Sequence, residues 1–175
     1  MPQPKFAHES LVTMTEMVLP NDTNTLNNLM GGRLLHWMDI CAAISAQKHS
    51  NRVVVTASVD NVSFSEPVKL GNIVTMQAKV TRAFNSSMEV NIEVWAEDIP
   101  AGTRMSTNRA FYTFVAVDQN GRPIEVPPVT PETDAEKELY ASALRRRQLR
   151  LVLAGRMKPH DAKELKALFG EMEEE

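Results

Sequence analysis

Several features that would place a protein in a common functional class are scarce or missing in this chain of 175 residues. It has one cysteine, Cys41, so a disulfide within the chain is excluded. No apolar run approaches the roughly 20 residues of a membrane-spanning helix. The start, "MPQPKFAHES", lacks the basic and apolar regions of a secretory signal. We therefore expect no membrane partner and a reducing, cytoplasmic compartment.

An excess of positive charge is also missing. The sequence has 19 Lys and Arg residues against 22 Asp and Glu residues, and its formal net charge is −3. Proteins that bind nucleic acid or anionic membranes through their overall field are usually basic, so neither partner is expected and any anion site must be local. There is no second cysteine and no H-E-x-x-H spacing, so no metal site is predicted.

What is present is a chain of domain size, 43% hydrophobic, with two kinds of hydrophobic period. The spacing of apolar residues from Gly32 to Lys48 predicts a largely buried helix. Alternation of apolar and polar residues predicts strands, which fall at residues 11–18, 52–64, 72–84, 86–98 and 103–118. Pro131–Leu153 and Pro159–Phe169 are predicted to be helices, the first capped by Thr133 or Asp134.

Short linkers with Gly, Pro, Asn or Ser, such as the one around Pro67 and Gly71, predict antiparallel hairpins between successive strands. One helix cannot cover both faces of a five-stranded sheet, so the sheet should wrap round the helix. The predicted architecture is an α+β hotdog fold, with a long antiparallel sheet wrapped round a central helix over residues 8–125 and a C-terminal helical extension over residues 130–175. Pairing with a second copy would cover the exposed sheet edge, so a homodimer is the smallest unit expected.

Three blocks of the sequence resemble the acyl-CoA thioesterases of the hotdog superfamily, both the bacterial YciA-like enzymes and the eukaryotic cytosolic acetyl-CoA hydrolase and brown-fat thioesterase group. The blocks are "PNDTN....N.MGG.LL.WMD", "VVTASVDNVSF..PV..G..V...AKVTRAFNSSMEV.IEVW" and "AFYTFVAVD.NGRP". The segment "LRRRQLRL" resembles the one that follows the first hotdog domain of the acetyl-CoA hydrolase type. The resemblance implies hydrolysis of acyl-CoA to a free fatty acid and coenzyme A by a trimer of hotdog dimers. Coenzyme A is then part of the substrate and product, and no cofactor is expected.

Asp39 is the first catalytic candidate, because it is an acid among the apolar residues of the predicted helix. It follows Gly32 by seven residues, about two turns, and so shares a face with the helix start. Unpaired N–H groups at that start, opened by Gly31 and Gly32, could stabilise the oxyanion of thioester hydrolysis. Asp39 could then be a general base or a nucleophile that forms an anhydride, and the residues leave that choice open. An interhelix or capping acid is the alternative, and the resemblance carries the catalytic acid onto Asp39.

Asn28 could place its side-chain amide near the thioester carbonyl or the attacking water. The resemblance implies that an Asn or Asp at this position completes the site from the subunit opposite the one that supplies the acid, although the acetyl-CoA hydrolase group departs from an amide here. A turn role for Asn28 is the alternative, and Asn24 is a weaker competitor. His36 and Cys41 are interpreted as packing residues, because relatives tolerate other side chains in place of His36 and Cys41 lies about 200° round the helix from Asp39.

Coenzyme A carries phosphates that must meet local donors in a mildly acidic protein. The turn "RAFNSSME" places Ser86 and Ser87 near Arg82, and "LRRRQLR" gathers arginines within two turns of a predicted helix, a pattern that alone favours a solvated face. The resemblance implies coenzyme contacts at Ala57, Ser58, Val59, Ser86, Ser87, Met88 and either Arg146 or Arg147. Backbone groups of the strand segment would bond the pantetheine amides.

Two other functions stay open at this stage. A hotdog dehydratase or hydratase acting on acyl thioesters needs a His paired with an acid in a different pattern, which is not evident. A non-catalytic acyl-CoA-binding sensor would fit the same fold, but no DNA-binding segment accompanies the domain, and retention of Asp39 favours chemistry.

Overall fold

The structure, a computed structural model, describes residues 2–60 and 62–170. Asn61, inside a predicted strand, and residues 171–175, at the end of the predicted extension, lie outside the described residues. The chain divides into two compact units, Met1–Thr130 and Pro131–Glu175. The two units are described separately.

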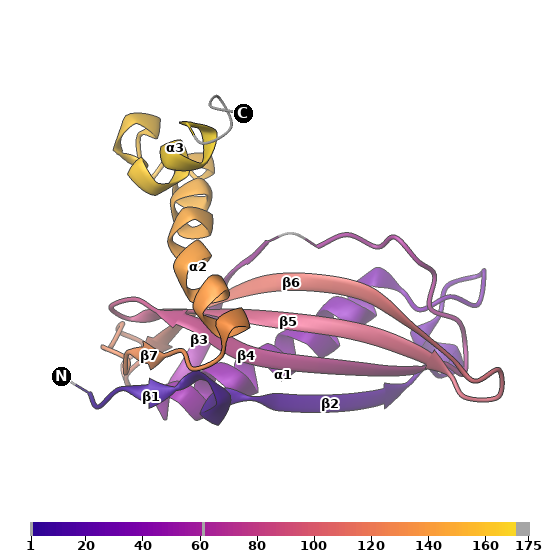
Figure 1. The fold of residues 1–175 in the computed structure, drawn as a ribbon. Coiled ribbons are helices and arrows are strands. Elements are labelled where there is room, and N and C mark those ends of the chain that lie inside the picture. Colours follow the sequence, from indigo (N-terminus) through magenta and orange to yellow (C-terminus); the bar gives the residue numbers. More distant parts are fainter. Residues whose placement is uncertain (1, 61, 171–175) are drawn as a thin grey trace. The chain divides into compact units, whose positions relative to one another are not determined.

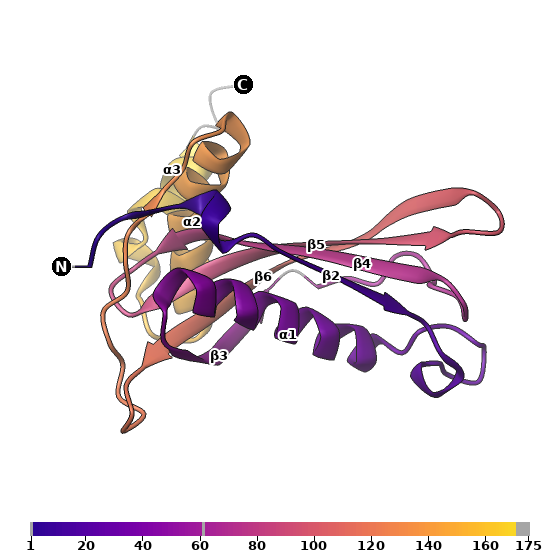
Figure 2. The same ribbon diagram turned by 90° about the horizontal axis from the view of Figure 1, so that it is seen from below.

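The first unit is a five-stranded antiparallel sheet with one long helix, α1 (Gly31–Ser50), against one face (Figures 1 and 2). Its strands are β2 (Val12–Met17), β3 (Val53–Asp60), β4 (Ile73–Ala83), β5 (Ser87–Asp98) and β6 (Thr103–Val117). They lie in the order β2-β4-β5-β6-β3. The α+β hotdog architecture predicted from the sequence is confirmed.

Alternation along β5 shows why the sheet faces the helix as it does. One face carries five apolar side chains that are at most 2% exposed, namely Met88, Val90, Ile92, Val94 and Ala96. Because successive side chains of a strand point to opposite faces, this single register buries the whole apolar set. The same face receives α1, whose Met38, Cys41 and Ala42 are fully buried.

The predicted hairpin between β3 and β4 is wrong. β3 pairs with β6, while β4 pairs with β2 and β5, so between β3 and β4 the chain crosses from the edge strand β3 past β6 and β5 to β4, next to the other edge. Pro67 and Gly71 favour a turn locally, but turn residues say nothing about which strand lies next to which. The crossing segment runs past the start of α1, where the Leu29 N–H donates to the Val68 carbonyl at 2.7 Å.

A second, two-stranded sheet was not predicted, because two-residue strands have no period to detect. In it β1 (Lys5–Phe6) pairs in parallel with β7 (Val129–Thr130). Two 3-10 turns, η1 (Ala7–Ser10) and η2 (Pro20–Asp22), flank β2. Near the other end of α1 the fully buried His49 ring lies with Nε2 2.7 Å from the Pro127 carbonyl.

The second unit consists of α2 (Asp134–Leu153), the 3-10 turn η3 (Pro159–Asp161) and α3 (Lys163–Gly170). Thr133, one of the two predicted caps, is the N-cap: its Oγ1 accepts from the Glu136 N–H at 3.2 Å, and Glu136 accepts from the Thr133 N–H at 3.3 Å. Gln148 accepts from the Leu165 N–H at 3.0 Å and links the two helices. Across the described part of the chain, no helix is long and apolar enough to cross a membrane.

Candidate active site

The start of α1 has unsatisfied backbone donors. Its N-cap is Met30, which offers no side-chain acceptor, and the Arg33 and Leu34 N–H groups both donate to the Met30 carbonyl. The N–H groups of Gly31 and Gly32 meet no acceptor among the described residues. A Cβ built on Gly32 would touch nothing within 4 Å, whereas one built on Gly31 would lie 3.2 Å from the Phe64 ring, so the open space is at Gly32. The helix end can therefore receive a carbonyl or an anion.

Asp39 lies in the middle of α1, half-buried, and is held by Thr56 of β3. The Thr56 Oγ1 donates to Asp39 Oδ1 at 2.8 Å. Directly after Thr56 the β3–β6 register shifts, so Ala57 is left out of the ladder. Sequence reasoning missed Thr56, because the contact depends on β3 lying beside α1. Its hydroxyl fixes one carboxylate oxygen and leaves the other available for a proton.

Asp39 faces an open cavity of about 670 Å³, lined also by Gly32, Leu35, His36, Val59, Val62 and Tyr112. Burial, and then the nearby Asp39, raise the pKa of Tyr112, whose hydroxyl donates to the Leu35 carbonyl at 3.3 Å. The Tyr112 side chain that lines the cavity is therefore uncharged at neutral pH. His36 is exposed at its mouth, so the packing interpretation of His36 is wrong. Cys41 is fully buried, as that interpretation requires, and burial raises its pKa to about 11.

Asp39 and the start of α1 lie on the same face of the helix, but they are not in contact. Seven residues at 1.5 Å each separate Gly32 and Asp39 by about 10 Å along the axis. A general base must reach its proton directly or through one water, and an Asp side chain leaning toward the N-terminus spans only part of the gap. The donors at the start of α1 and the acid of the same chain thus line one cavity about two turns apart, and a substrate carbonyl with its attacking water would have to span that gap.

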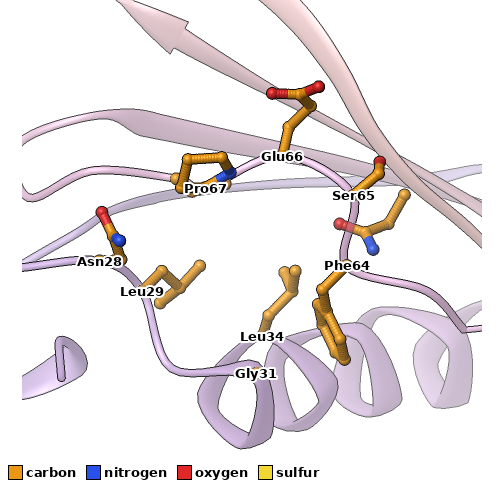
Figure 3. Close-up of a pocket in the computed structure, with 10 residues that line it drawn as sticks. Asn28, Leu29, Gly31, Leu34, Phe64, Ser65, Glu66 and Pro67 are labelled. Carbon is orange, nitrogen blue, oxygen red and sulfur yellow. The ribbon is translucent and has the colours of Figure 1, made fainter. Parts of the chain in front are cut away.

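Asn24 and Asn28 lie in the loop that leads into α1. The Asn24 Oδ1 accepts from the Leu26 N–H at 2.9 Å and from the Asn28 N–H at 3.2 Å, whereas its Nδ2 has no acceptor within the described ranges. Asn28 lines a second cavity of about 380 Å³ together with Gly31 and Phe64. Figure 3 shows that Leu29 and Leu34 point into this space. Both asparagines are thus close in sequence to the helix start, and the Nδ2 of each has no acceptor within the described ranges.

The predicted coenzyme contacts of the first unit fall in two places. Ala57, Ser58 and Val59 lie on β3, an edge strand that pairs only with β6 among the described strands. The Ser58 Oγ is buried and has no partner in the described residues. The β4–β5 turn brings Arg82, Ser86 and Ser87 together, with the Phe84 N–H donating to the Ser87 carbonyl at 2.8 Å and the Arg82 guanidinium 5.7 Å from the Phe84 ring. The Met88 side chain is fully buried in the core, so it can offer only backbone to a ligand.

Arg146 and Arg147 lie on α2 of the second unit. The Arg146 guanidinium donates to the Ser142 Oγ at 2.6 Å and to the Leu139 carbonyl at 2.8 Å, so it lies back along its own helix. Burial, and then Arg150 and Arg156, lower the pKa of Arg147. This concentration of positive charge is suited to a phosphate.

The described residues were also considered as metal ligands. Within the described ranges, no group of three or more His, Cys, Asp or Glu side chains could hold a metal ion. The chemistry available at α1 is that of a carboxylate, an amide and backbone donors.

The chain is similar to known thioesterases along most of its length. The sequence model of the Thioesterase superfamily matches residues 26–103. An uncharacterized acyl-CoA thioester hydrolase of Bacillus subtilis is 43% identical over 145 residues, which cover 83% of this chain and 84% of that protein.

Solved structures share the fold. An apo hexameric acyl-CoA thioesterase matches with a TM-score of 0.84 at 39% identity, covering 87% of this chain and 98% of that one. An acyl-CoA hydrolase from Staphylococcus aureus, in complex with butyryl coenzyme A, coenzyme A and coenzyme A disulfide, matches with a TM-score of 0.80 at 38% identity, covering 88% and 95%. Three variants of that enzyme, in which an Asp, an Asn or a Thr is replaced by Ala, have also been solved. The chain therefore belongs to the Thioesterase superfamily and is a hotdog-fold acyl-CoA thioesterase.

Proposed function

We propose that this thioesterase hydrolyses acyl-CoA at a site shared by two subunits. One subunit supplies the Gly31 and Gly32 N–H groups and the Asn24 amide, and the other supplies Asp39 with Thr56. The observation that carries the proposal is the exposed apolar surface beside Asp39, where Ile40 of α1 and Val59 of β3 are 37% and 41% exposed and a second copy would cover them. A second α1, running antiparallel across a two-fold axis, would bring an acid to each helix start.

The Staphylococcus aureus variants support the choice of residues. In that enzyme the replaced Asp follows the replaced Asn by 15 residues and precedes the replaced Thr by 17. Asn24, Asp39 and Thr56 have the same two spacings in this chain. The spacings favour Asn24 over Asn28, so the catalytic role of Asn28 stays a prediction that this proposal does not use.

The reaction needs no cofactor in this scheme. The thioester carbonyl oxygen accepts the Gly31 and Gly32 N–H groups, and the Asn24 Nδ2 orients the attacking water or the carbonyl. Asp39 takes the proton of the water as its oxygen bonds to the carbonyl carbon, and the negative charge moves to the oxyanion. Collapse of this intermediate breaks the C–S bond, and the thiolate of coenzyme A takes up a proton as the free acid leaves.

Direct attack by Asp39 is the competing route, and it gives an acyl anhydride that water then opens. A single turnover in ¹⁸O-water distinguishes the two routes. The general-base route puts the label in the released acid and leaves Asp39 unlabelled. Attack of water on the aspartyl carbon of an anhydride puts the label in Asp39 instead and leaves the released acid unlabelled, so label in Asp39 identifies the anhydride route.

Exposed apolar side chains on β3 and α1 support pairing of two subunits at this edge of the sheet. Val53, Val55 and Val59 of this edge strand are 65%, 48% and 41% exposed, and Ile40 and Ile44 of α1 are 37% and 39% exposed. Monomeric proteins avoid a long apolar edge of this kind. We infer that a homodimer forms here and that three dimers assemble as a hexamer, as in the hexameric relative. Mass measurement by light scattering tests both steps, and a monomer at micromolar concentration would contradict them.

The coenzyme would lie along the β3 edge and the β4–β5 turn. Ala57, Ser58 and Val59 offer backbone groups to the pantetheine amides. Arg82, with the Ser86 and Ser87 hydroxyls, would bind phosphate. A coenzyme contact by Arg146 or Arg147 of the second unit stays a separate prediction. An alanine variant of each arginine should raise the KM for acyl-CoA without lowering kcat.

Replacement of Asp39 tests the catalytic assignment. Asp39→Ala should abolish release of free thiol from acyl-CoA substrates, measured from acetyl-CoA to palmitoyl-CoA, while binding of coenzyme A persists. Glu125→Ala, an exposed acid on the exit segment, is the matched control. Unchanged hydrolysis by Asp39→Ala would refute the assignment, and a wild-type protein that binds acyl-CoA without releasing thiol would favour a sensor.

A further inference from the structure

Asp22 is a buried acid with several bonds that the reaction scheme does not use. It is 7% exposed, and it lies two residues before Asn24 in the loop that precedes α1. Its Oδ2 accepts from the Leu19 N–H at 2.9 Å, and its backbone carbonyl accepts from the Met30 N–H at 2.9 Å. A carboxylate with so little exposure needs such partners.

The second carboxylate oxygen joins the loop to the helix. Asp22 Oδ1 lies 3.1 Å from Nε of Arg33, in the first turn of α1. In the described part of the chain it is the one side-chain bond between the loop and α1. The loop is already closed on itself without this bond, because Thr23 donates to the Pro20 carbonyl and the Asn24 N–H donates to the Asn28 carbonyl. The ion pair therefore adds a side-chain link to the backbone bond from the Met30 N–H to the Asp22 carbonyl, and the two together hold the loop against the helix start.

Arg33 stands where helices disfavour a positive charge. The first turn of a helix carries the positive end of its dipole, so a cation there is locally unfavourable. Asp22 neutralises this cation beside the uncapped Gly31 and Gly32 N–H groups.

We propose that Asp22 and Arg33 are a positioning pair that holds the Asn24 amide in register with the oxyanion donors at the start of α1. This inference rests on the proposed role of Asn24. The Asn24 side chain is itself oriented by two backbone donors, the N–H groups of Leu26 and Asn28. If the loop shifts, the Asn24 amide therefore shifts with it. Breaking the ion pair would let the loop shift, and small misplacements of a group that acts at the transition state lower kcat.

The test is a double-mutant cycle in kcat. Asp22→Asn and Arg33→Gln should each lower kcat five- to twentyfold with KM changed less than twofold, and Arg33→Lys should recover part of the loss. In an Asn24→Ala background, Asp22→Asn should cause no further loss, because the group that the pair positions is already gone. Lys137→Gln, which breaks the exposed Lys137–Asp134 pair of α2, is the control and should leave kcat unchanged.

Three outcomes would overturn the inference. If Asp22→Asn keeps kcat within twofold, the pair positions nothing. If its loss multiplies with that of Asn24→Ala, the pair acts through general stability. If Asn24→Ala itself keeps full activity, the proposed role of Asn24 fails and the inference fails with it. Should Asp22→Asn not fold, Arg33→Gln alone, at a side chain 37% exposed, runs the same cycle.

Discussion

Thr56→Val removes one hydroxyl from the site and keeps the shape of the side chain. The Thr56 Oγ1 donates to Asp39 Oδ1 at 2.8 Å, and a hydrogen bond to a charged group contributes about 1.5–3 kcal/mol. Thr56 is exposed in the isolated chain, so water can replace part of the bond and the lower end of the range applies. About 1.4 kcal/mol corresponds to a tenfold change, and we expect kcat to fall by about that factor.

The assay is thiol release at saturating acyl-CoA, with circular dichroism to verify that the fold is intact. Thr56→Ser keeps the hydroxyl and should stay within about threefold of wild type. Thr103→Val, at an exposed position at the start of β6, should leave kcat unchanged. A folded Thr56→Val enzyme with wild-type kcat would show that Asp39 needs no fixed orientation, which would refute the reasoning.

Three further predictions concern buried groups and the shared site. Burial lowers the pKa of His49 despite its bond to the Pro127 carbonyl. As the pH falls below the ordinary histidine pKa of about 6.5, the unfolded chain therefore binds a proton that the folded chain does not, and the folded state loses stability. Thermal melts should show stability declining from pH 7.5 to 5.5, and declining less in His49→Gln. Because burial raises the pKa of Cys41 to about 11, iodoacetamide at pH 7.5 should neither alkylate the native enzyme nor inhibit it, as mass spectrometry would reveal. Equal amounts of Asn24→Ala and Asp39→Ala, refolded together, should recover about a quarter of wild-type activity, since half of the dimers would then have one intact site; no recovery would mean that each site lies within one chain.

Local patterns in the sequence predicted most of the elements but not their neighbours. The spacing of apolar residues predicted α1 and the long strands, because a segment that buries one face shows that spacing in its own sequence. Which strands pair is decided by packing between distant segments, so the linker with Pro67 and Gly71 was read as a hairpin although it crosses the sheet. The Thr56–Asp39 bond could not be foreseen for the same reason, since it requires β3 to lie beside α1. His36 was misjudged because a position three residues from Asp39 on a buried helix can still face the cavity mouth.

The crossing segment between β3 and β4 also bears on the order in which the enzyme folds and fails. The β5–β6 hairpin closes locally, whereas both outer strands join the sheet through distant pairings, Val12 with Ala78 and Val53 with Val117. Such pairings carry a large loop-closure entropy and form late. The loop before α1 is bonded to the crossing segment, and Thr56 sits on an outer strand, so the catalytic groups depend on the last parts of the sheet to assemble. Fraying at either edge would stop turnover while the central strands stay folded. On heating or in denaturant, activity would therefore be lost before the protein unfolds as a whole.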